Sequence, residues 1–366
     1  MKSLTIGQVC AMLAIGVVSN KLLLLPSIMY QYAGQDALFV ILFKFLLAIL
    51  FVGLIMYVLV KNPDKNLREI VSSVIGDIGY RVLAFFIFIM YLVKCFTLLM
   101  ESELFLSSTM YEEYNKILFI VPTIFIVGYL AYKGLRTVGR TCEALVKVIF
   151  IGLFITFLLS LSELDPSNIL PLGTTPLSSM IDALNACFLW YGNYFILFFC
   201  LGDVKFSKGM VKKVYLTLIF SIMFVLAFFF LYYANFEYTS IFHKFAISDI
   251  TQFTPEIASF TKVDWFTIII WMITSVLQCA IQVYIMQRSF IEAFNIRKSQ
   301  LFSFIFLAVY TLIYILLPFN SSEVINFVTR YASPYVLIVG IIIIALLLIA
   351  TIRLKRLKKK ESPNNV

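Results

Sequence analysis

The feature that most constrains this chain is a series of apolar runs long enough to cross a lipid bilayer. Segments such as FVILFKFLLAILFVGLIMYVLV (39–60) and IIIIALLLIATI (341–352) are continuously apolar and do not alternate. A run of roughly 20 such residues spans the hydrocarbon core as a helix. Within hydrocarbon only helices and closed barrels satisfy their own backbone hydrogen bonds, and the lack of alternation argues against a barrel. The sequence therefore predicts an all-α integral membrane protein.

Composition and charge support this prediction. Hydrophobic residues make up 61% of the 366 positions and charged residues only 13%, whereas soluble domains carry about 25% charged residues. The net charge of +9 does not indicate a nucleic-acid binder, because the basic residues form short clusters between apolar runs. Such clusters are typical of the positive-inside pattern of membrane proteins.

The apolar runs predict ten transmembrane helices. The first run follows Lys2 but lacks an A-x-A-like cleavage site, so we interpret it as a membrane span and not as a signal peptide. The expected spans are 6–30, 37–60, 81–109, 117–132, 141–162, 180–201, 214–234, 264–287, 300–317 and 325–352.

The distribution of Lys and Arg predicts the orientation of these spans. With ten spans, 21 Lys and Arg residues fall on one side, and only Lys116, Lys244, Lys262 and Arg330 fall on the other. The positive-inside rule then puts both termini in the cytoplasm. We expect a single transmembrane domain over 1–352 and a basic cytoplasmic tail over 353–366, which would contact anionic headgroups before becoming disordered.

Two connections carry recognisable structure of their own. Apolar residues between 67 and 75 have helical spacing opposite polar ones, which predicts a short interfacial helix. The loop 235–262 is long enough for one or two short helices, and it would act either as a lid or as a passive surface loop.

Two spans are interrupted by polar and helix-breaking residues. The first contains Gly16, Ser19, Asn20, Lys21 and Pro26, and the sixth contains Trp190, Tyr191, Gly192, Asn193 and Tyr194. These spans occupy matching positions if the chain consists of two five-helix repeats, about 6–162 and 180–352. Paired interruptions are the best sequence indication of a transporter-type binding site. The alternative is that Gly and Asn only permit close packing of helices.

Ionisable and amide side chains within the spans give a second signal, because each is costly in hydrocarbon. Lys94 lies at the depth of Lys21 and Asn193, so both lysines need either neutral amines or an anionic partner such as Glu101 or a ligand carboxylate. Gln278 is also near mid-depth, whereas we expect Lys44 and Glu103 to extend to the interface. Glu143 and Lys147 have the i,i+4 spacing of a structural pair, with an ion-coupling role as the alternative.

Nothing in the sequence indicates catalysis, a metal or a cofactor. The six cysteines form no CxxC or Cys/His ligand pattern, and the single histidine, His243, lies in a loop. Phosphate-binding and hydrolase motifs are also absent. We therefore expect a protein that is not an enzyme and that needs no cofactor.

The stretch TIGQVCAMLAIGVVSNKLLLLPSIMYQYAGQDAL, which ends at Leu38, resembles the opening of spore germination permeases, the B subunits of nutrient germinant receptors. Its family-like positions are Gln8, Leu25-Pro26 and the turn 33–37. The segments GLRTVGRTCEAL (134–145) and SNILPL (167–172) are similar to the entry of the fifth helix and the loop before the sixth.

This resemblance implies a LeuT-like fold of the amino acid–polyamine–organocation superfamily, with a 5+5 inverted repeat and broken helices one and six. It also implies a small nutrient, often an amino acid, held between helices one, three, six and eight. Companion A and C receptor subunits and the inner membrane of a bacterial spore are implied as well. The chain departs from the family at Ser19-Asn20-Lys21, where small residues are usual, at Asn193, where Glu is frequent, and at Leu38, where Trp is usual.

The leading hypothesis is a membrane subunit that binds a nutrient at mid-depth and triggers germination. One alternative is a stand-alone amino-acid secondary transporter. The other is a structural subunit with a degenerate pocket, in which the Lys21 side chain occupies the space of the ligand and does not contact one. The candidate ligand-binding residues are Ser19, Asn20, Lys21, Lys94, Trp190, Tyr191, Gly192, Asn193 and Gln278. The candidates for an ion pair or for coupling are Glu101, Glu143 and Lys147.

Overall fold

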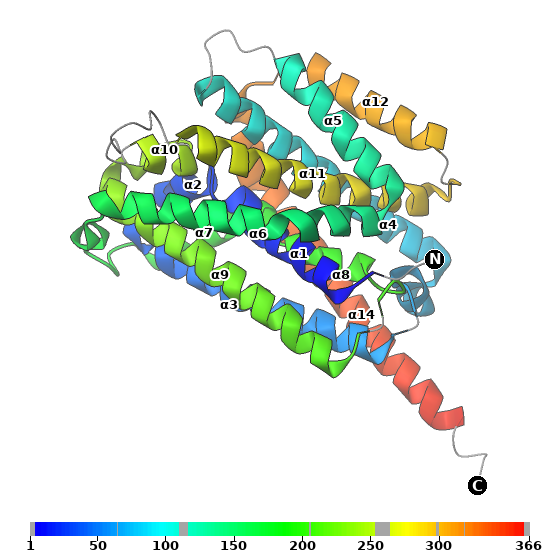
Figure 1. Ribbon diagram of the computed structural model, residues 1–366. Helices are drawn as coiled ribbons and strands as arrows, with labels where there is room; N and C mark the ends of the chain where they lie inside the picture. Colours follow the sequence, from blue (N-terminus) through cyan, green and yellow to red (C-terminus); the bar gives the residue numbers. More distant parts are fainter. Residues whose placement is uncertain are drawn as a thin grey trace.

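The computed structural model describes residues 4–63, 65–109, 116–204, 206–252, 264–297, 300–317 and 319–361. Helices and short turns account for these residues, and the described part of the chain contains no strand. The prediction of an all-helical protein is thus confirmed. Figure 1 shows the long helices side by side in one bundle.

Six helical segments among the described residues are long and apolar enough to cross a membrane. The helices at their centres are α3 (Ala37–Lys61), α4 (Leu67–Thr109), α6 (Leu135–Leu159), α9 (Lys208–Phe236), α11 (Asp264–Phe294) and α14 (Ser333–Glu361). Four shorter apolar segments accompany them: Ile6–Lys21, Ile117–Lys133, Phe188–Phe199 and Phe302–Leu316. Each shorter segment coincides with one of the remaining predicted spans, and the ten-span topology stays a prediction.

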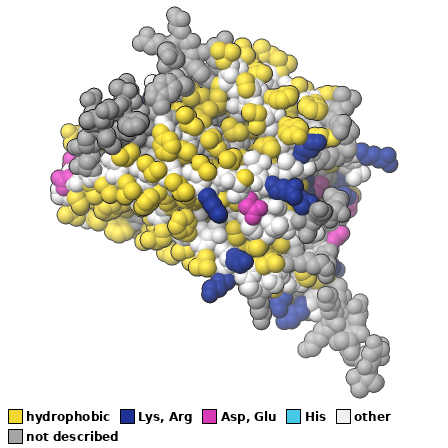
Figure 2. Space-filling view, in the orientation of Figure 1, with side chains coloured by type: hydrophobic (Ala, Val, Ile, Leu, Met, Phe, Trp, Pro, Cys, Tyr) yellow, Lys and Arg dark blue, Asp and Glu magenta, His cyan; other side chains and the backbone are white. Residues whose placement is uncertain are grey.

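The centre of the bundle is formed by α1 (Ile6–Val18), which packs against α6, α9 and α11. The most extensive helix contact joins α4 and α11, while α5 (Lys116–Lys133) and α12 (Gln300–Leu316) pack on each other and α5 also contacts α11. Large apolar side chains on α3, α6, α9 and α12 point outwards, and hydrophobic atoms cover much of the face drawn in Figure 2. An apolar outer surface is what a lipid environment requires.

The two ends of the bundle differ in charge. Lys61, Lys133, Arg288 and Arg353 belong to the end near both chain termini, which we call the basic end and which the sequence predicts to be cytoplasmic. In Figure 2 the Lys and Arg side chains gather on the half of the face nearest this end. We call the other end, with α10 (Ala246–Gln252), the opposite end.

Several short segments differ in detail from the sequence prediction. The interfacial helix over 67–75 is present as the first part of α4, and Gly76, with φ 75° and ψ 174°, separates it from the membrane segment. The loop 235–262 does contain short helices, η7 (Glu237–Ile241) and α10, although residues 253–263 lie outside the described part. Helix α14 continues beyond residue 352, the predicted end of the last span, to Glu361, and residues 362–366 lie outside the described part. The backbone of the tail is therefore helical as far as Glu361.

Candidate functional site

The first predicted interruption is present. Helix α1 ends at Val18, the 3₁₀ turn η1 (Ser19–Lys21) follows, and α2 (Leu25–Ala33) resumes with Pro26 at its start. Asn20 has φ −89° and ψ 16°, outside the helical region. Ser and Asn form helices weakly because their side chains compete for backbone groups, and Pro lacks the N–H that would continue the helix. Ser19, Asn20 and Lys21 are all buried, at 1%, 4% and 2% exposure.

The second predicted interruption is longer. Helix α7 (Leu177–Ala186) gives way to two 3₁₀ turns, η5 (Phe188–Trp190) and η6 (Asn193–Phe195), before the short helix α8 (Ile196–Phe199). Gly192 joins the turns in the left-handed conformation, with φ 79° and ψ 5°. A Cβ at this position would also lie 3.2 Å from the ring of Phe195. The reversal therefore favours glycine at residue 192.

Asn193 joins the two interruptions directly. Its Nδ2 donates to the carbonyl of Gly16 at 2.6 Å and to Oδ1 of Asn20 at 3.1 Å. A Cβ on Gly16 would lie 3.2 Å from Cβ of Asn193 and 3.5 Å from Oε1 of Gln278. The absence of a side chain on Gly16 thus allows Asn193 and Gln278, which come from different helices, to meet α1. We call this region, where the breaks meet, the junction.

Three buried lysines bind backbone carbonyls that the interruptions release. Lys94 of α4 donates to the carbonyls of Leu189 and Tyr191, the latter at 2.9 Å. Lys21 donates to the carbonyl of Val17 at 2.7 Å, and its Nζ lies 5.1 Å from the centroid of the Tyr191 ring.

Lys44 is the third of these lysines, and the prediction that it extends to the interface is wrong. Its side chain is 2% exposed and donates to the carbonyl of Leu184, near the end of α7, at 2.6 Å. Nζ also lies 3.9 Å and 4.7 Å from the ring centroids of Phe188 and Tyr191. The apolar run of α3 gives no sign of which helix face meets α7, and Lys44 lies on that face.

The single carboxylate buried near the junction is Glu101, among the described residues. It accepts a hydrogen bond of 2.7 Å from Nε1 of Trp190 and forms no ion pair with Lys94 in the described structure. The backbone N–H of Leu189 donates to Oγ of Ser333 at 3.0 Å. Glu101 and Ser333 therefore hold the turn that contains Trp190 from two sides.

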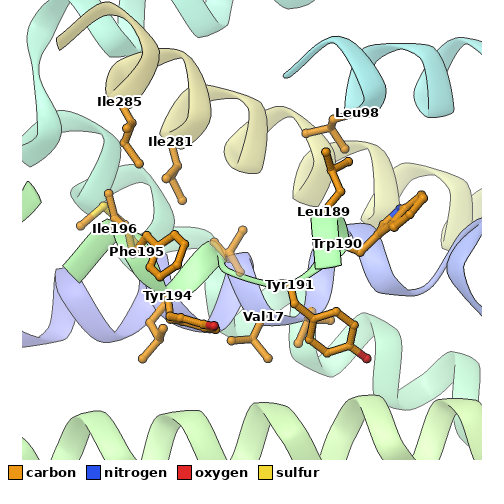
Figure 3. Close-up of a cluster of buried hydrophobic side chains, with 14 of the residues drawn as sticks. Val17, Leu98, Leu189, Trp190, Tyr191, Tyr194, Phe195, Ile196, Ile281 and Ile285 are labelled. Atoms are coloured by element: carbon orange, nitrogen blue, oxygen red, sulfur yellow. The ribbon is translucent and has the colours of Figure 1, made fainter. Parts of the chain in front are cut away.

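Apolar contacts fix the remainder of this segment. In Figure 3, Phe195 and Ile196 face Ile281 and Ile285 of α11, while Tyr191 and Tyr194 lie on the side of Val17. Since Trp190 and Tyr191 are only 0% and 4% exposed, the broken segment is enclosed between α1 and α11.

Several buried polar atoms around the junction make no hydrogen bond within the described structure. They are Ser19 Oγ, Tyr191 OH, Asn193 Oδ1, Glu101 Oε2, Gln278 Oε1 and both amide atoms of Gln282. Buried polar groups without partners are unfavourable and are uncommon in folded proteins. Their concentration here is what a site for a polar ligand or for ordered water requires.

Glu143 and Lys147 lie apart from the junction. Both are exposed on α6, and they form no ion pair with each other in the described part of the chain. Oε1 of Glu143 would lie 2.2 Å from a Cβ on Gly7, so this carboxylate packs against the start of α1. The structural pair expected from their i,i+4 spacing is not formed.

Contacts at both ends enclose the junction. At the basic end, Arg288 donates to the carbonyl of Phe199 at 3.1 Å and to Glu292 at 3.0 Å, and Tyr80 also donates to Glu292. The sequence had indicated Arg288 only as a marker of orientation.

At the opposite end, the first turn of α10 binds the unwound part of the first span. The backbone N–H groups of Ala246 and Ile247 donate to the carbonyls of Leu23 and Leu22, at 3.2 and 3.0 Å. Both ends are therefore closed in this structure.

The described residues contain no group of three His, Cys, Asp or Glu side chains that could hold a metal ion. The arrangement is that of an integral membrane protein of permease type, in which two interrupted helices meet at a buried polar junction. The family model for spore germination proteins matches residues 3–324, and the chain belongs to this family of spore germination permeases. No curated protein matches the chain.

Proposed function

We propose that this chain is the membrane subunit of a spore nutrient-germinant receptor and that it binds a small nutrient at the junction. In this proposal the chain has ten spans arranged as a LeuT-like 5+5 inverted repeat. Both termini lie in the cytoplasm, and companion A and C subunits in the spore inner membrane relay the signal. Family membership supports the setting, and the contact of Asn193 with the first interruption is the observation that carries the proposed site.

The mechanism that we propose is a shift between closed and open populations. A ligand can move such an equilibrium only if it contacts one state better than the other. The hydrogen bonds from Asn193, Arg288 and α10 close the site on three sides. Ligand groups that pair with the unpartnered atoms of Ser19, Tyr191 or Gln278 in one state only would stabilise that state and change the relative populations of the two states.

One observation favours the alternative of a structural subunit with a degenerate pocket. The side chains of Lys21, Lys44 and Lys94 are buried and already donate hydrogen bonds to carbonyl groups at the interruptions. In that alternative the lysines complete the fold and no ligand enters.

A combined germination and binding experiment separates these functions. Spores that lack the gene are tested against a panel of nutrients, and the purified chain in lipid nanodiscs is tested for binding and uptake of the same compounds. The receptor proposal expects loss of the response to at least one nutrient, together with binding of that nutrient. Normal germination with every nutrient would overturn it, and uptake by the chain alone would then indicate a transporter.

Site variants localise the response. Lys21→Ala and Gly192→Trp should change the dose of nutrient needed for germination more than Glu143→Gln does, because only the first two residues belong to the interruptions. Protein levels in the spore membrane must be matched by immunoblot. Equal effects of all three variants would count against the junction as the binding site.

A further inference from the structure

The three lysines at the junction occupy positions that favour positive charge. The carboxyl end of a helix carries a partial negative charge, and in transporters with broken helices the unwound carbonyls and half-helix ends coordinate Na⁺ or protons. Here Lys21 binds the last turn of α1, Lys44 binds the last turn of α7, and Lys94 binds two carbonyls beyond it. The chain thus supplies lysine amines of its own where a mobile cation would otherwise be expected.

The buried charges near the junction do not balance. Among the described residues the fully buried ionisable Lys, Arg, Asp and Glu side chains are Lys21, Lys44, Lys94, Glu101 and Asp36. Asp36 is engaged elsewhere, because it accepts from the backbone N–H groups of Gly173 and Thr175 at the opposite end. Three lysine amines then have one carboxylate near them. Because uncompensated buried charge is unfavourable, an anionic ligand would be needed to keep more than one of these amines charged.

All three lysines contact Tyr191. Lys21 and Lys44 lie 5.1 and 4.7 Å from the centroid of the same Tyr191 ring, and Lys94 donates to the carbonyl of Tyr191 at 2.9 Å. Each ammonium group has three N–H donors, and Lys21 and Lys44 each donate only one hydrogen bond within the described structure. Both lysines therefore have donors left for an anion.

Neighbouring polar groups add to these donors. The hydroxyl groups of Ser19 and Tyr191 are buried and make no hydrogen bond in the described structure. The unpartnered acceptors are Asn193 Oδ1, Gln278 Oε1, Gln282 Oε1 and Glu101 Oε2, and only Glu101 is ionisable. The junction therefore offers lysine amines, which can hold their protons beside an anion, but mainly neutral acceptors to a cation.

From this geometry we infer that the junction binds a small carboxylate of net negative charge and requires no metal cation bound beside it. The inference rests on the proposed function, since it names the class of ligand for the same site. The carboxylate approaches Lys21 and Lys44 beside Tyr191. Asn193 and Gln278 accept hydrogen bonds from neutral groups of the ligand.

Matched ligand pairs test the inference on the unmodified protein. Binding to the purified chain in zwitterionic nanodiscs is measured for L-aspartate and L-asparagine, which have nearly the same shape, and for succinate and L-lysine. Each titration is repeated with choline replacing Na⁺. We expect aspartate or succinate to bind at least 10-fold more tightly than asparagine or lysine, with less than a two-fold change on removing Na⁺.

Substitutions of two lysines on α3 test whether Lys44 causes the preference for an anionic ligand. Lys44→Met should abolish the preference for the anionic ligand, whereas Lys61→Met, which removes an exposed lysine from the same helix α3, should retain it. Tighter binding of asparagine or lysine, or a requirement for Na⁺, would overturn the inference while leaving the proposed function intact. A germination response to nutrients without binding of any of them by this chain would instead count against the proposed site as a whole.

Discussion

The contact between the two interruptions can be tested by removing the side chain of Asn193. Its Nδ2 group donates to the carbonyl of Gly16 and to Oδ1 of Asn20, at 2.6 and 3.1 Å. Asn193→Ala removes both hydrogen bonds and leaves both acceptors buried without this donor. If the interruptions separate when the site opens, the substitution destabilises the closed state selectively.

The size of the effect follows from the number of bonds lost. Side-chain hydrogen bonds within membranes contribute about 0.6 kcal/mol on average and up to about 1.7 kcal/mol. Loss of two such bonds corresponds to about 1–3 kcal/mol, and this range shifts an equilibrium about 5- to 150-fold. The population of the open state should rise by that factor.

A cysteine at residue 19 reports the opening. The Ser19 side chain is 1% exposed and its hydroxyl makes no hydrogen bond in the described structure, so Ser19→Cys disturbs little. The other cysteines are buried except the half-buried Cys10, which is replaced by serine. The rate of modification by a hydrophilic maleimide in nanodiscs then measures how often water reaches the junction.

Asn62→Ala provides the matched control. Asn62 is also buried and also donates two hydrogen bonds, each 3.0 Å long, to the carbonyl of Val58 and to Oγ1 of Thr351 near the basic end. Both variants should lose similar thermal stability, but only Asn193→Ala should accelerate labelling of residue 19. An unchanged labelling rate in Asn193→Ala, or equal acceleration in both variants, would refute the reasoning.

Three further predictions concern the left-handed turn, the basic end and α10. Gly192→Ala and Gly173→Ala both introduce a Cβ at φ 79°, at a cost of about 1–2 kcal/mol each. Only Gly192→Ala should weaken ligand binding, as measured by isothermal titration calorimetry. Equal weakening by both variants would contradict a role of the Gly192 turn in binding. Arg288→Lys keeps the positive charge but loses the planar guanidinium that binds the carbonyl of Phe199 and the carboxylate of Glu292 together. A cysteine introduced inside the basic end should then react with maleimide several-fold faster. An unaltered rate would contradict closure by Arg288. Burial raises the pKa of Asp249 to about 6. The protonated carboxyl group therefore favours the folded state at low pH, and this contribution to stability is lost as the pH rises through 6. Thermal unfolding should therefore show the wild type losing about 1 kcal/mol relative to Asp249→Asn between pH 5 and 7, and parallel pH profiles would exclude this role.

The helices could be predicted well because a bilayer leaves few other structures for a long apolar run. Their ends were predicted less well. The interfacial helix predicted over 67–75 runs into the third span within α4, with Gly76 between them, and α14 continues past residue 352 to Glu361. Hydropathy predicts which residues lie in the hydrocarbon core, but it does not predict where a helix ends, because a helix can continue into the headgroup region.

The interruptions could be predicted because their cause is local. Ser19-Asn20 and Gly192-Asn193 are weak helix formers within apolar runs, and each disturbs the helix at its own position. Contacts between helices are a different problem. Lys44 was expected at the interface because its depth is known from sequence, whereas its orientation towards α7 depends on how α3 and α7 pack.

The closure of the site was the feature hardest to predict from the sequence, because backbone groups form much of it. At the opposite end, the N–H groups of Ala246 and Ile247 bind carbonyls of the first span, and any residue except proline could donate these bonds. At the basic end the acceptor is again a backbone carbonyl, that of Phe199. At the opposite end the first interruption itself frees the carbonyls of Leu22 and Leu23, so the break that opens a polar space in the bundle also provides groups that close it.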